Sequence, residues 1–290
     1  MDVDNLKALV AVAQCGSFSE AAKILHLTQP AVSKRIAALE FELDRPLFDR
    51  IGRQIQLTQA GRTLLPRAEI ILNQVSEAKR AISDLSGEVR GELKVATSHH
   101  LGLHKLPPVL RRFAATYPGV NLQFEFLDSE VALQKVLAGR CELAVVTLSP
   151  SPLEQLVYTP LWQDKLAFVC AQQSGLPSTT QLSTLSKHPA ILPDLNTYTG
   201  RLVKLCFDQH NLPLSLSMAT NYLETIKMMV SVGLGWSVLP ISMVDSNIRI
   251  LNLPGISLSR TLGIAIHQKR HLSNAAKAFY DALCVNTEVN

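Results

Sequence analysis

The chain has 290 residues, 47% of them hydrophobic, and a formal net charge of only +4. This length exceeds that of a typical single domain, and the apolar content is ample for a sizeable core. The modest charge excludes a histone-like polycation. Any affinity for DNA therefore has to come from the local placement of basic residues rather than from global attraction.

Neither a secretory signal nor a membrane span is evident in the sequence. The N-terminus, MDVDNLKALV, is charged from its second residue and lacks a basic region followed by an apolar core. The longest apolar stretch, residues 228–240, is interrupted by serines and glycines and is too short to span a bilayer. We expect a cytoplasmic protein with no membrane partner.

The cysteines are scattered along the chain and never spaced CxxC: Cys15, Cys141, Cys170, Cys206 and Cys284. This pattern favours buried free thiols in a reducing cytoplasm. A redox switch is the alternative reading of the same residues.

The chain begins with three helical patterns. Apolar residues recur at helical spacing in residues 6–13, which predicts a first helix. Ser17 and Glu20 stand three apart, as in a capping box, and predict a second helix around residues 18–25. Thr28 offers a hydroxyl cap to a third helix, and Pro30 falls in its first turn, where a missing N–H costs nothing.

The third helix has two contrasting faces. Its apolar face consists of Val32, Ile36, Leu39 and Leu43. The opposite face is small or polar and carries Pro30, Ser33, Lys34, Ala37 and Ala38, flanked by Gln29 and Arg35. Small side chains let a helix approach base edges closely, and the polar ones hydrogen-bond bases or phosphates. An ordinary solvated helix face is the alternative.

The following residues favour the DNA interpretation. Ile55 and Leu57 alternate with glutamines, as in a half-buried strand, and Gly52-Arg53 predicts a turn. No acidic residue stands between positions 50 and 67, a stretch that contains Arg50, Arg53, Arg62 and Arg67. Such a basic tip suits a phosphate track or a narrow minor groove.

At this point the sequence resembles the LysR-type transcriptional regulators. The shared pattern comprises Phe18-Ser19-Glu20-Ala21-Ala22, Thr28-Gln29-Pro30-Ala31-Val32-Ser33, Leu39-Glu40, Pro46-Leu47-Phe48, Arg50 and Leu57-Thr58-Gln59-Ala60-Gly61. One departure is Asp44, where the family usually has Gly. Asp tolerates a left-handed helix end better than most residues, so we expect little change there.

The resemblance implies a winged helix-turn-helix that binds double-stranded promoter DNA. The DNA-binding residues it suggests are Thr28, Gln29, Pro30, Ser33, Lys34, Arg35 and Arg50, with Arg53 reaching from the wing. It also allows RNA polymerase as a further partner.

A long helix follows, with apolar residues at alternating steps of four and three: Leu64, Ala68, Ile71, Val75, Ala78, Ile82 and Leu85. This alternation is typical of a coiled-coil seam and predicts pairing with a second copy. A helix packed on its own domain is the alternative. The family resemblance also implies a homodimer through this helix, and commonly a homotetramer.

From residue 91 strands alternate with helices, the βαβ rhythm of a mostly parallel sheet. Two such sets predict an α/β fold with two subdomains and a cleft between them. By resemblance this is an effector domain similar to type 2 periplasmic binding proteins. The expected divisions are residues 1–58 for the winged helix-turn-helix, 59–87 for the linker helix and 88–290 for the effector domain. Within the latter, subdomain I would hold 88–163 and 266–290, and subdomain II 164–265, the chain crossing near 163 and returning near 266.

A ligand in such a fold lies beyond the carboxyl ends of strands, against helix N-termini that attract anions. The candidates at these places are Thr97, Ser98, His99, His100, Ser129, Thr147, Thr197, Thr199, Tyr222 and Glu224. Each hydroxyl alone is better explained as a helix cap. Together they predict a site for a small anionic effector, held without a buried arginine.

Three other interpretations are a metal site, an enzyme and a transporter's solute-binding protein. His100 and His104 would share a helical face, but no carboxylate or cysteine stands in matching register, so we expect no metal and no cofactor. An enzyme would need a catalytic motif, and the sequence has no GxSxG elbow, Walker loop or GxGxxG. A transporter's solute-binding protein is opposed by the DNA-binding pattern. We therefore expect a regulator whose promoter binding responds to a small molecule, not an enzyme.

Overall fold

The computed structural model describes residues 1–51 and 54–285, except for the side chains at positions 50, 51, 54 and 83. The chain forms two compact units, Met1–Ser86 and Gly87–Asn290. Within the described ranges, no helix combines the length and the apolar character needed to cross a membrane.

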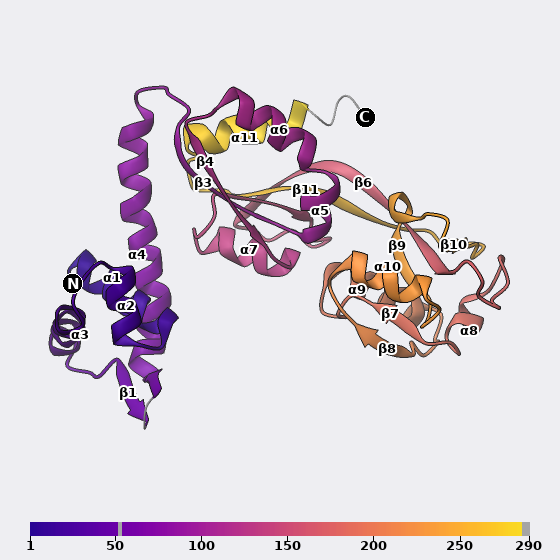
Figure 1. Cartoon of the computed structure of the whole chain (residues 1–290), viewed down its shortest axis with the longest axis horizontal. Coiled ribbons are helices and arrows are strands. Elements are labelled where there is room, and N and C mark those ends of the chain that lie inside the picture. Colours follow the sequence, from indigo (N-terminus) through magenta and orange to yellow (C-terminus); the bar gives the residue numbers. More distant parts are fainter. Residues whose placement is uncertain (52–53, 286–290) are drawn as a thin grey trace. The chain divides into compact units, whose positions relative to one another are not determined.

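The first unit is a bundle of helices with a two-stranded antiparallel wing (Figure 1). Its elements are α1 (Val3–Cys15), α2 (Phe18–Ile24), α3 (Gln29–Leu43), β1 (Phe48–Ile51), β2 (Gln54–Leu57) and α4 (Gln59–Asp84). Apolar side chains from all four helices and from Leu47 form one core. Burial of this core accounts for most of the favourable free energy of folding, at about 25 cal/mol per Å² of apolar surface.

Two helix starts in this unit differ in how they are capped. The Ser17 hydroxyl accepts a hydrogen bond from the Glu20 N–H, as the sequence predicts. Thr28 occupies the N-cap position of α3, but its side chain makes no capping bond, so that prediction is wrong. The reason is local: the N–H groups of Ala31 and Val32 both donate to the Thr28 carbonyl instead.

The two faces of α3 are largely as expected. Val32, Ile36 and Leu39 are buried in the core. Leu43 is 37% exposed and does not continue that face, because α3 ends there and Asp44 turns the chain away in the left-handed region (φ 50°). Asp44 therefore adopts the conformation for which the family usually uses Gly.

The wing is fastened to α3 and α4 by two specific contacts. The Glu40 carboxylate accepts hydrogen bonds from the N–H groups of Leu47 (2.7 Å) and Phe48 (3.4 Å). On α4, a Cβ at Gly61 would lie 2.2 Å from the Leu47 carbonyl oxygen, so no larger residue fits there. Glu40 and Gly61 both belong to the LysR-like pattern, and both serve the packing of the wing.

The apolar seam of α4 divides into two parts. Ala68 is fully buried in the core of the first unit, and Leu64 and Ile71 pack against that core. This half of the helix therefore packs on its own domain, and its pairing with a second copy stays a prediction. Near the end of the helix Ile82 is 72% exposed, and Leu85, just beyond the helix, is 84% exposed, which leaves two large apolar side chains in water.

The second unit is an α/β structure built on one long sheet (Figure 1). Its elements are β3 (Gly91–Thr97), α5 (His99–His104), α6 (Pro107–Thr116), β4 (Val120–Phe126), α7 (Ser129–Leu137), β5 (Leu143–Thr147), β6 (Leu156–Ala171), α8 (Leu182–Leu185), β7 (Ala190–Leu192), α9 (Tyr198–Gln209), β8 (Leu216–Ala219), α10 (Leu223–Ser231), β9 (Ser237–Pro240), η1 (Ile241–Met243), β10 (Ile248–Leu251), β11 (Leu258–His267) and α11 (Asn274–Val285).

The long sheet is mixed rather than mostly parallel, which corrects the expectation from the sequence. The strand order is β10-β6-β11-β5-β3-β4, with β9 also paired to β6. In the described part of this sheet β3 pairs in parallel with β4 and β5, and the pairs that involve β6 or β11 are antiparallel. The difference arises because the sixteen-residue β6 and the returning β11 run past each other in opposite directions. A separate parallel pair is formed by β7 and β8.

Strands β6 and β11 pass between two halves of this unit (Figure 1). The first half packs α5, α6, α7 and α11 on β3 and β5, and the second packs α8, α9 and α10 around β7 and β9. The register pairs Gln163 with Thr261. Because Leu262 and Ile264 already belong to the core of the first half, the chain returns near residue 261, earlier than the expected 266.

Candidate functional sites

The exposed face of α3 carries the residues predicted to contact DNA. Gln29, Pro30 and Lys34 are exposed, and Ser33 is half-buried. The Gln29 amide donates to the Ser33 hydroxyl over 3.0 Å, which holds both side chains in a fixed arrangement on the first turn of the helix. Helix α3 therefore presents a row of hydrogen-bonding groups at its N-terminal end, the end that recognition helices direct toward base edges.

The predicted basic residues around this face differ in their settings. Arg35 lies 3.5 Å from the Asp4 carboxylate on α1, so part of its charge is already paired within the unit. The Arg50 backbone lies in β1, opposite Ile55, and its side chain is not described. Arg53 lies outside the described residues. Of the predicted cations, Lys34 is the one that is described, exposed and on the polar face of α3.

In the second unit, a small cavity lies between the two halves. Seven of the ten predicted effector residues line it: Ser98, His99, His100, Ser129, Thr147, Thr197 and Thr199. They come from both halves, since the first five belong to the half with β3 and β5 and the last two to the start of α9. The topology thus gathers polar groups that lie far apart in the chain.

Three predicted residues do not line this cavity. Thr97 is fully buried and donates its hydroxyl proton to the Val145 carbonyl (2.8 Å), a structural bond between β3 and β5. Tyr222 is about half exposed to solvent, and the centre of its ring lies 4.6 Å from that of the His99 ring. Glu224 pairs with His104. Thr97, Tyr222 and Glu224 therefore lie outside the lining of this cavity, and contact of these residues with an effector stays a prediction.

The helix caps at the cavity also differ from the predicted ones. Ser129 is not the cap of α7; Asp128 holds that position, and the Ser129 hydroxyl accepts the Thr147 N–H over 3.1 Å. Thr197 caps α9 by accepting the Gly200 N–H. Thr199, expected in the loop, lies inside the first turn of α9, because the helix begins at Tyr198.

A buried arginine, which the sequence reading did not foresee, lines the cavity. Arg260 on β11 donates to Asp164 on β6 (2.8 Å) and to the Thr199 hydroxyl (2.8 Å), with only 10% of its side chain exposed. Burial lowers the pKa of Arg260, and the Asp164 charge acts in the opposite direction. A guanidinium remains protonated in proteins, so this corner of the cavity carries a cation.

His100 is the cavity's buried imidazole. Burial, together with the positive charge of Arg260, lowers the pKa of His100 to about 3, so the ring is neutral at physiological pH. Its Nε2 lies 4.0 Å from the Asp164 carboxylate, which is too far for a hydrogen bond. Because the ring is uncharged, this approach is not an ion pair.

Two carboxylates of the first half reach across to the second half. Glu130 accepts hydrogen bonds from the Tyr198 N–H, at the start of α9, and from Arg201. Asp128 accepts from the Asn221 amide over 2.7 Å. Burial raises the pKa of Glu130, while the Tyr198 N–H and Arg201 act in the opposite direction. These contacts hold the two halves together and occupy donors at the cavity.

The cavity is small in this structure, about 60 Å³, which is room for about two water molecules. It adjoins a hollow of about 800 Å³ with which it shares Thr147, Tyr198 and Arg260. Ligand pockets usually measure about 300–1,000 Å³. An organic ligand that reaches Arg260 therefore needs the two halves to separate slightly, or enters from the larger hollow.

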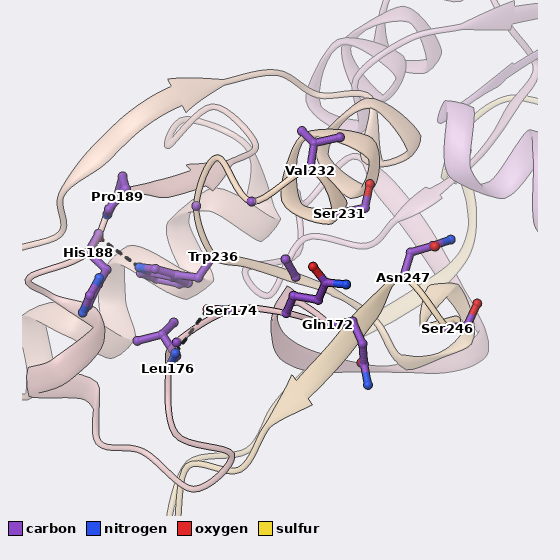
Figure 2. Close-up of a pocket in the computed structure, with 15 residues that line it drawn as sticks. Gln172, Ser174, Leu176, His188, Pro189, Ser231, Val232, Trp236, Ser246 and Asn247 are labelled. Atoms are coloured by element: carbon purple, nitrogen blue, oxygen red, sulfur yellow. Dashed lines mark hydrogen bonds between the residues drawn. The ribbon is translucent and has the colours of Figure 1, made fainter.

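A third hollow, of about 950 Å³, lies in the second half only (Figure 2). Figure 2 shows Gln172, Ser174, His188 and Asn247 around it, and Trp236, whose indole N–H donates to the His188 carbonyl. Its lining contains no Asp, Glu, Lys or Arg, and none of the predicted effector residues. The cavity between the halves is the better candidate because it combines a cation with several helix starts.

Among the described residues, none of the cysteines is joined to another in a disulfide. Cys141, Cys170 and Cys206 are buried, and Cys15 and Cys284 are half-buried. Burial raises the pKa of Cys141 to about 11 and also raises that of Cys206. Both thiols are protonated at neutral pH, and protonated thiols are poor nucleophiles.

A winged helix-turn-helix unit joined to a periplasmic-binding-protein-like unit defines a ligand-responsive transcription regulator. Comparison with known families agrees: residues 86–284 match the LysR substrate binding domain, and residues 3–62 match the bacterial regulatory helix-turn-helix protein of the lysR family. The chain belongs to the LysR-type transcriptional regulators, which are not enzymes.

Relatives and solved structures give the same picture. A probable RuBisCO transcriptional regulator of Synechocystis is 32% identical over 289 residues, 96% of this chain and 84% of that protein. An uncharacterized HTH-type regulator from the ibpB-leuC intergenic region of Azotobacter vinelandii is 61% identical over 108 residues, 37% of this chain and 75% of that protein. The crystal structure of CbnR has a TM-score of 0.70 at 21% identity, with 99% of each chain covered, which is a likeness of fold.

Proposed function

We propose that this regulator binds double-stranded promoter DNA as a homo-oligomer, and that a small anion bound between the halves of its second unit changes that binding. The observation that carries the effector part is the convergence of helix starts and Arg260 on one cavity. The DNA part rests on the exposed N-terminal end of α3.

The electrostatics of the cavity favour an anion. Three helices of nine or more residues begin at its wall: α7 near Asp128, α9 near Thr197 and α10 near Asn221. Helix N-termini carry unpaired N–H groups and a partial positive charge, and Arg260 adds a full one. A structure of similar fold, the effector binding domain of QuiR, was solved with shikimate, the anion of an organic acid (TM-score 0.62, 17% identity, 69% of this chain).

The chain's own carboxylates use some of these donors. Glu130 accepts the Tyr198 N–H and lies beside Arg201. An anionic effector would compete for these groups and would change the contact between the halves. A ligand shifts such an equilibrium only by its difference in affinity for the two arrangements, and competition with Glu130 supplies that difference.

DNA binding by this chain is proposed through α3 and the wing. CbnR, which shares the fold, was also solved in complex with its target DNA (TM-score 0.69, 21% identity). In this chain, Gln29, Ser33 and Lys34 are placed to hydrogen-bond bases or phosphates. Pairing through the exposed end of α4 would bring two such helices to two half-sites.

The effector proposal is tested by a thermal-shift screen of the full chain against small carboxylic and other oxyacids. A ligand that binds the native state raises the unfolding temperature by mass action. Each acid is paired with its neutral amide or ester, which should give no shift. A hit should also lose its effect in Ser98→Trp, because Ser98 lines the cavity and the larger side chain fills it.

The DNA proposal is tested separately by gel shifts on fragments upstream of the chain's own and neighbouring genes, at two salt concentrations. Specific binding should weaken steeply with salt, because counterions are released from the phosphates. Failure of a folded sample to bind any such fragment at low salt would reject the DNA proposal. Acids and neutral analogues that act alike would reject the anion proposal.

A further inference from the structure

Next to the proposed effector cavity, two helices from opposite halves of the second unit bring together three side chains that ligate metals in proteins. His100 and His104 lie on α5, and Glu224 lies in the first turn of α10. One donor atom from each of them lies within 4.8 Å of the other two. The His104 Nε2 and a Glu224 oxygen are 2.8 Å apart, although these residues are 120 positions apart in sequence.

His100 is the unusual member of this cluster. Its side chain is 95% buried, yet among the described residues neither ring nitrogen has a hydrogen-bond partner. A buried polar group without a partner destabilises the folded state. The His100 ring packs beside the His104 ring, with centroids 4.8 Å apart, so the unpaired imidazole stands at the cluster itself.

We propose that His100, His104 and Glu224 bind a divalent transition-metal ion of the zinc type, and that this ion joins the two halves of the second unit. Two imidazoles and one carboxylate are a ligand set that zinc takes in proteins, with a fourth position left for water or another ligand. In a tetrahedral site the donor atoms stand about 3.3 Å apart, given metal–ligand distances of about 2.0–2.1 Å. The cluster closes to that spacing through the partly exposed Glu224 and His104 side chains.

The charges around the cluster are compatible with a cation. Arg260 lies near His100, but its charge is paired with Asp164 over 2.8 Å. Glu224 contributes a full negative charge to the cluster. The His104 and Glu224 side chains, 44% and 39% exposed, give the ion a path from solvent.

A simpler account treats His104 and Glu224 as an ordinary surface pair, which contributes little to stability. That account explains their contact but leaves His100 buried beside them without a partner. A metal ion explains both observations, since it supplies the missing partner of His100 and fixes the geometry of the other two. The sequence analysis predicted no metal, because no carboxylate stands in register with the two histidines. In the structure the carboxylate of Glu224 comes from another helix, α10.

The site differs from the proposed effector cavity in chemistry and in the residues that complete it. His104 and Glu224 do not line that cavity, while His100 touches both. A bound ion would tie α5 to α10 across the joint between the halves. Metal binding would therefore stabilise one arrangement of the halves, whether or not an organic anion is present.

The test uses the full chain, stripped of metal with a chelator and titrated with Zn²⁺ by calorimetry and with Co²⁺ by absorption spectroscopy. We expect one ion per chain and a Co²⁺ spectrum without a thiolate charge-transfer band, which excludes the cysteines. His104→Ala and Glu224→Gln change partly exposed residues and should fold as the parent does. Each should weaken Zn²⁺ binding at least about tenfold, the least that loss of even an outer-shell partner costs.

His271→Ala, at an exposed histidine away from the cluster, is the matched control and should bind as the parent does. Zn²⁺ should also raise the unfolding temperature of the parent and of this control, but not of His104→Ala. A thiolate band, or equal affinity in the parent and all three variants, would overturn the assignment. So would the absence of any Zn²⁺ binding by the folded parent.

Discussion

Asp164 and Arg260 face each other across the antiparallel pair of β6 and β11, where these strands pass between the two halves of the second unit. The Arg260 Nε donates to an Asp164 oxygen over 2.8 Å, and the two side chains are only 10% and 8% exposed. Arg260 also donates to Thr199, at the start of α9. One buried ion pair thus connects both crossing strands with a helix of the second half.

Breaking this pair from one side should be costly. Arg260→Met leaves the Asp164 charge buried without a partner, and we expect a loss of about 3–5 kcal/mol in the free energy of unfolding. The double variant Asp164→Leu with Arg260→Met should recover most of this loss, because two apolar side chains of similar volume replace the pair. Urea unfolding followed by circular dichroism measures all three proteins.

An exposed pair provides the control for that series. Lys204 and Asp208 are 2.6 Å apart on α9, and both are about half exposed. Lys204→Met should change the free energy of unfolding by no more than about 0.5 kcal/mol. If Arg260→Met were as mild as Lys204→Met, the buried pair would have no structural role at the joint.

Glu130 gives the effector unit a pH-dependent contact. Burial raises the pKa of Glu130 in the folded chain, so the folded state holds this proton more tightly than the unfolded state does. Stability from this group is therefore present at low pH and is lost as pH rises through the folded pKa. Glu130→Gln removes the titration, so its stability relative to the parent should rise with pH across that window.

The measurement is the unfolding temperature of the parent and of Glu130→Gln from mildly acidic to neutral pH. Glu154→Gln, at an exposed carboxylate of the same half, serves as the control and should follow the parent at every pH. The raised pKa would be contradicted if the unfolding temperature of Glu130→Gln relative to the parent stayed constant with pH, or fell as pH rises.

The exposed end of α4 should mediate self-association. Ile82 is 72% exposed in the single chain, and burying such a side chain is worth about 1.5–3 kcal/mol. Ile82→Asp should therefore weaken the dimer by at least about tenfold, as measured by analytical ultracentrifugation. Ser76→Asp adds the same charge at an exposed position of the same helix, and it should leave the association constant nearly unchanged. Equal effects of both variants would point to charge rather than to an apolar seam.

The parts of this protein that the sequence predicted well are those specified by residues near one another in the chain. The cap at Ser17, the proline in the first turn of α3 and the apolar spacing of Val32 and Ile36 all act within a few residues. Local patterns of this kind fix helices and strands before any tertiary contact is known.

The parts that the sequence missed depend on partners far away in the chain. Arg260 meets Asp164 across 96 positions, and Glu130 meets Tyr198 across 68. Nothing near Arg260 distinguishes it from a solvated arginine on a strand; only the antiparallel register of β6 and β11 buries it. The predicted hydroxyls, by contrast, reached the cavity because the ends of strands and the starts of helices meet there in this kind of sheet.

Lys34 should contribute to DNA affinity in a way that salt reveals. It is exposed on the polar face of α3, beside the Gln29–Ser33 pair. If Lys34 neutralises one phosphate, the variant Lys34→Ala should bind all DNA sequences more weakly to the same degree. The slope of the logarithm of its DNA-binding constant against the logarithm of salt concentration should fall by about one. Lys79→Ala, at an exposed lysine of α4, is the matched control and should retain the parental slope. A variant that keeps the slope but loses preference among operator sequences would place Lys34 on a base edge instead. An unchanged affinity and slope would remove Lys34 from the DNA-binding surface, because a lysine at that interface cannot be lost without either effect.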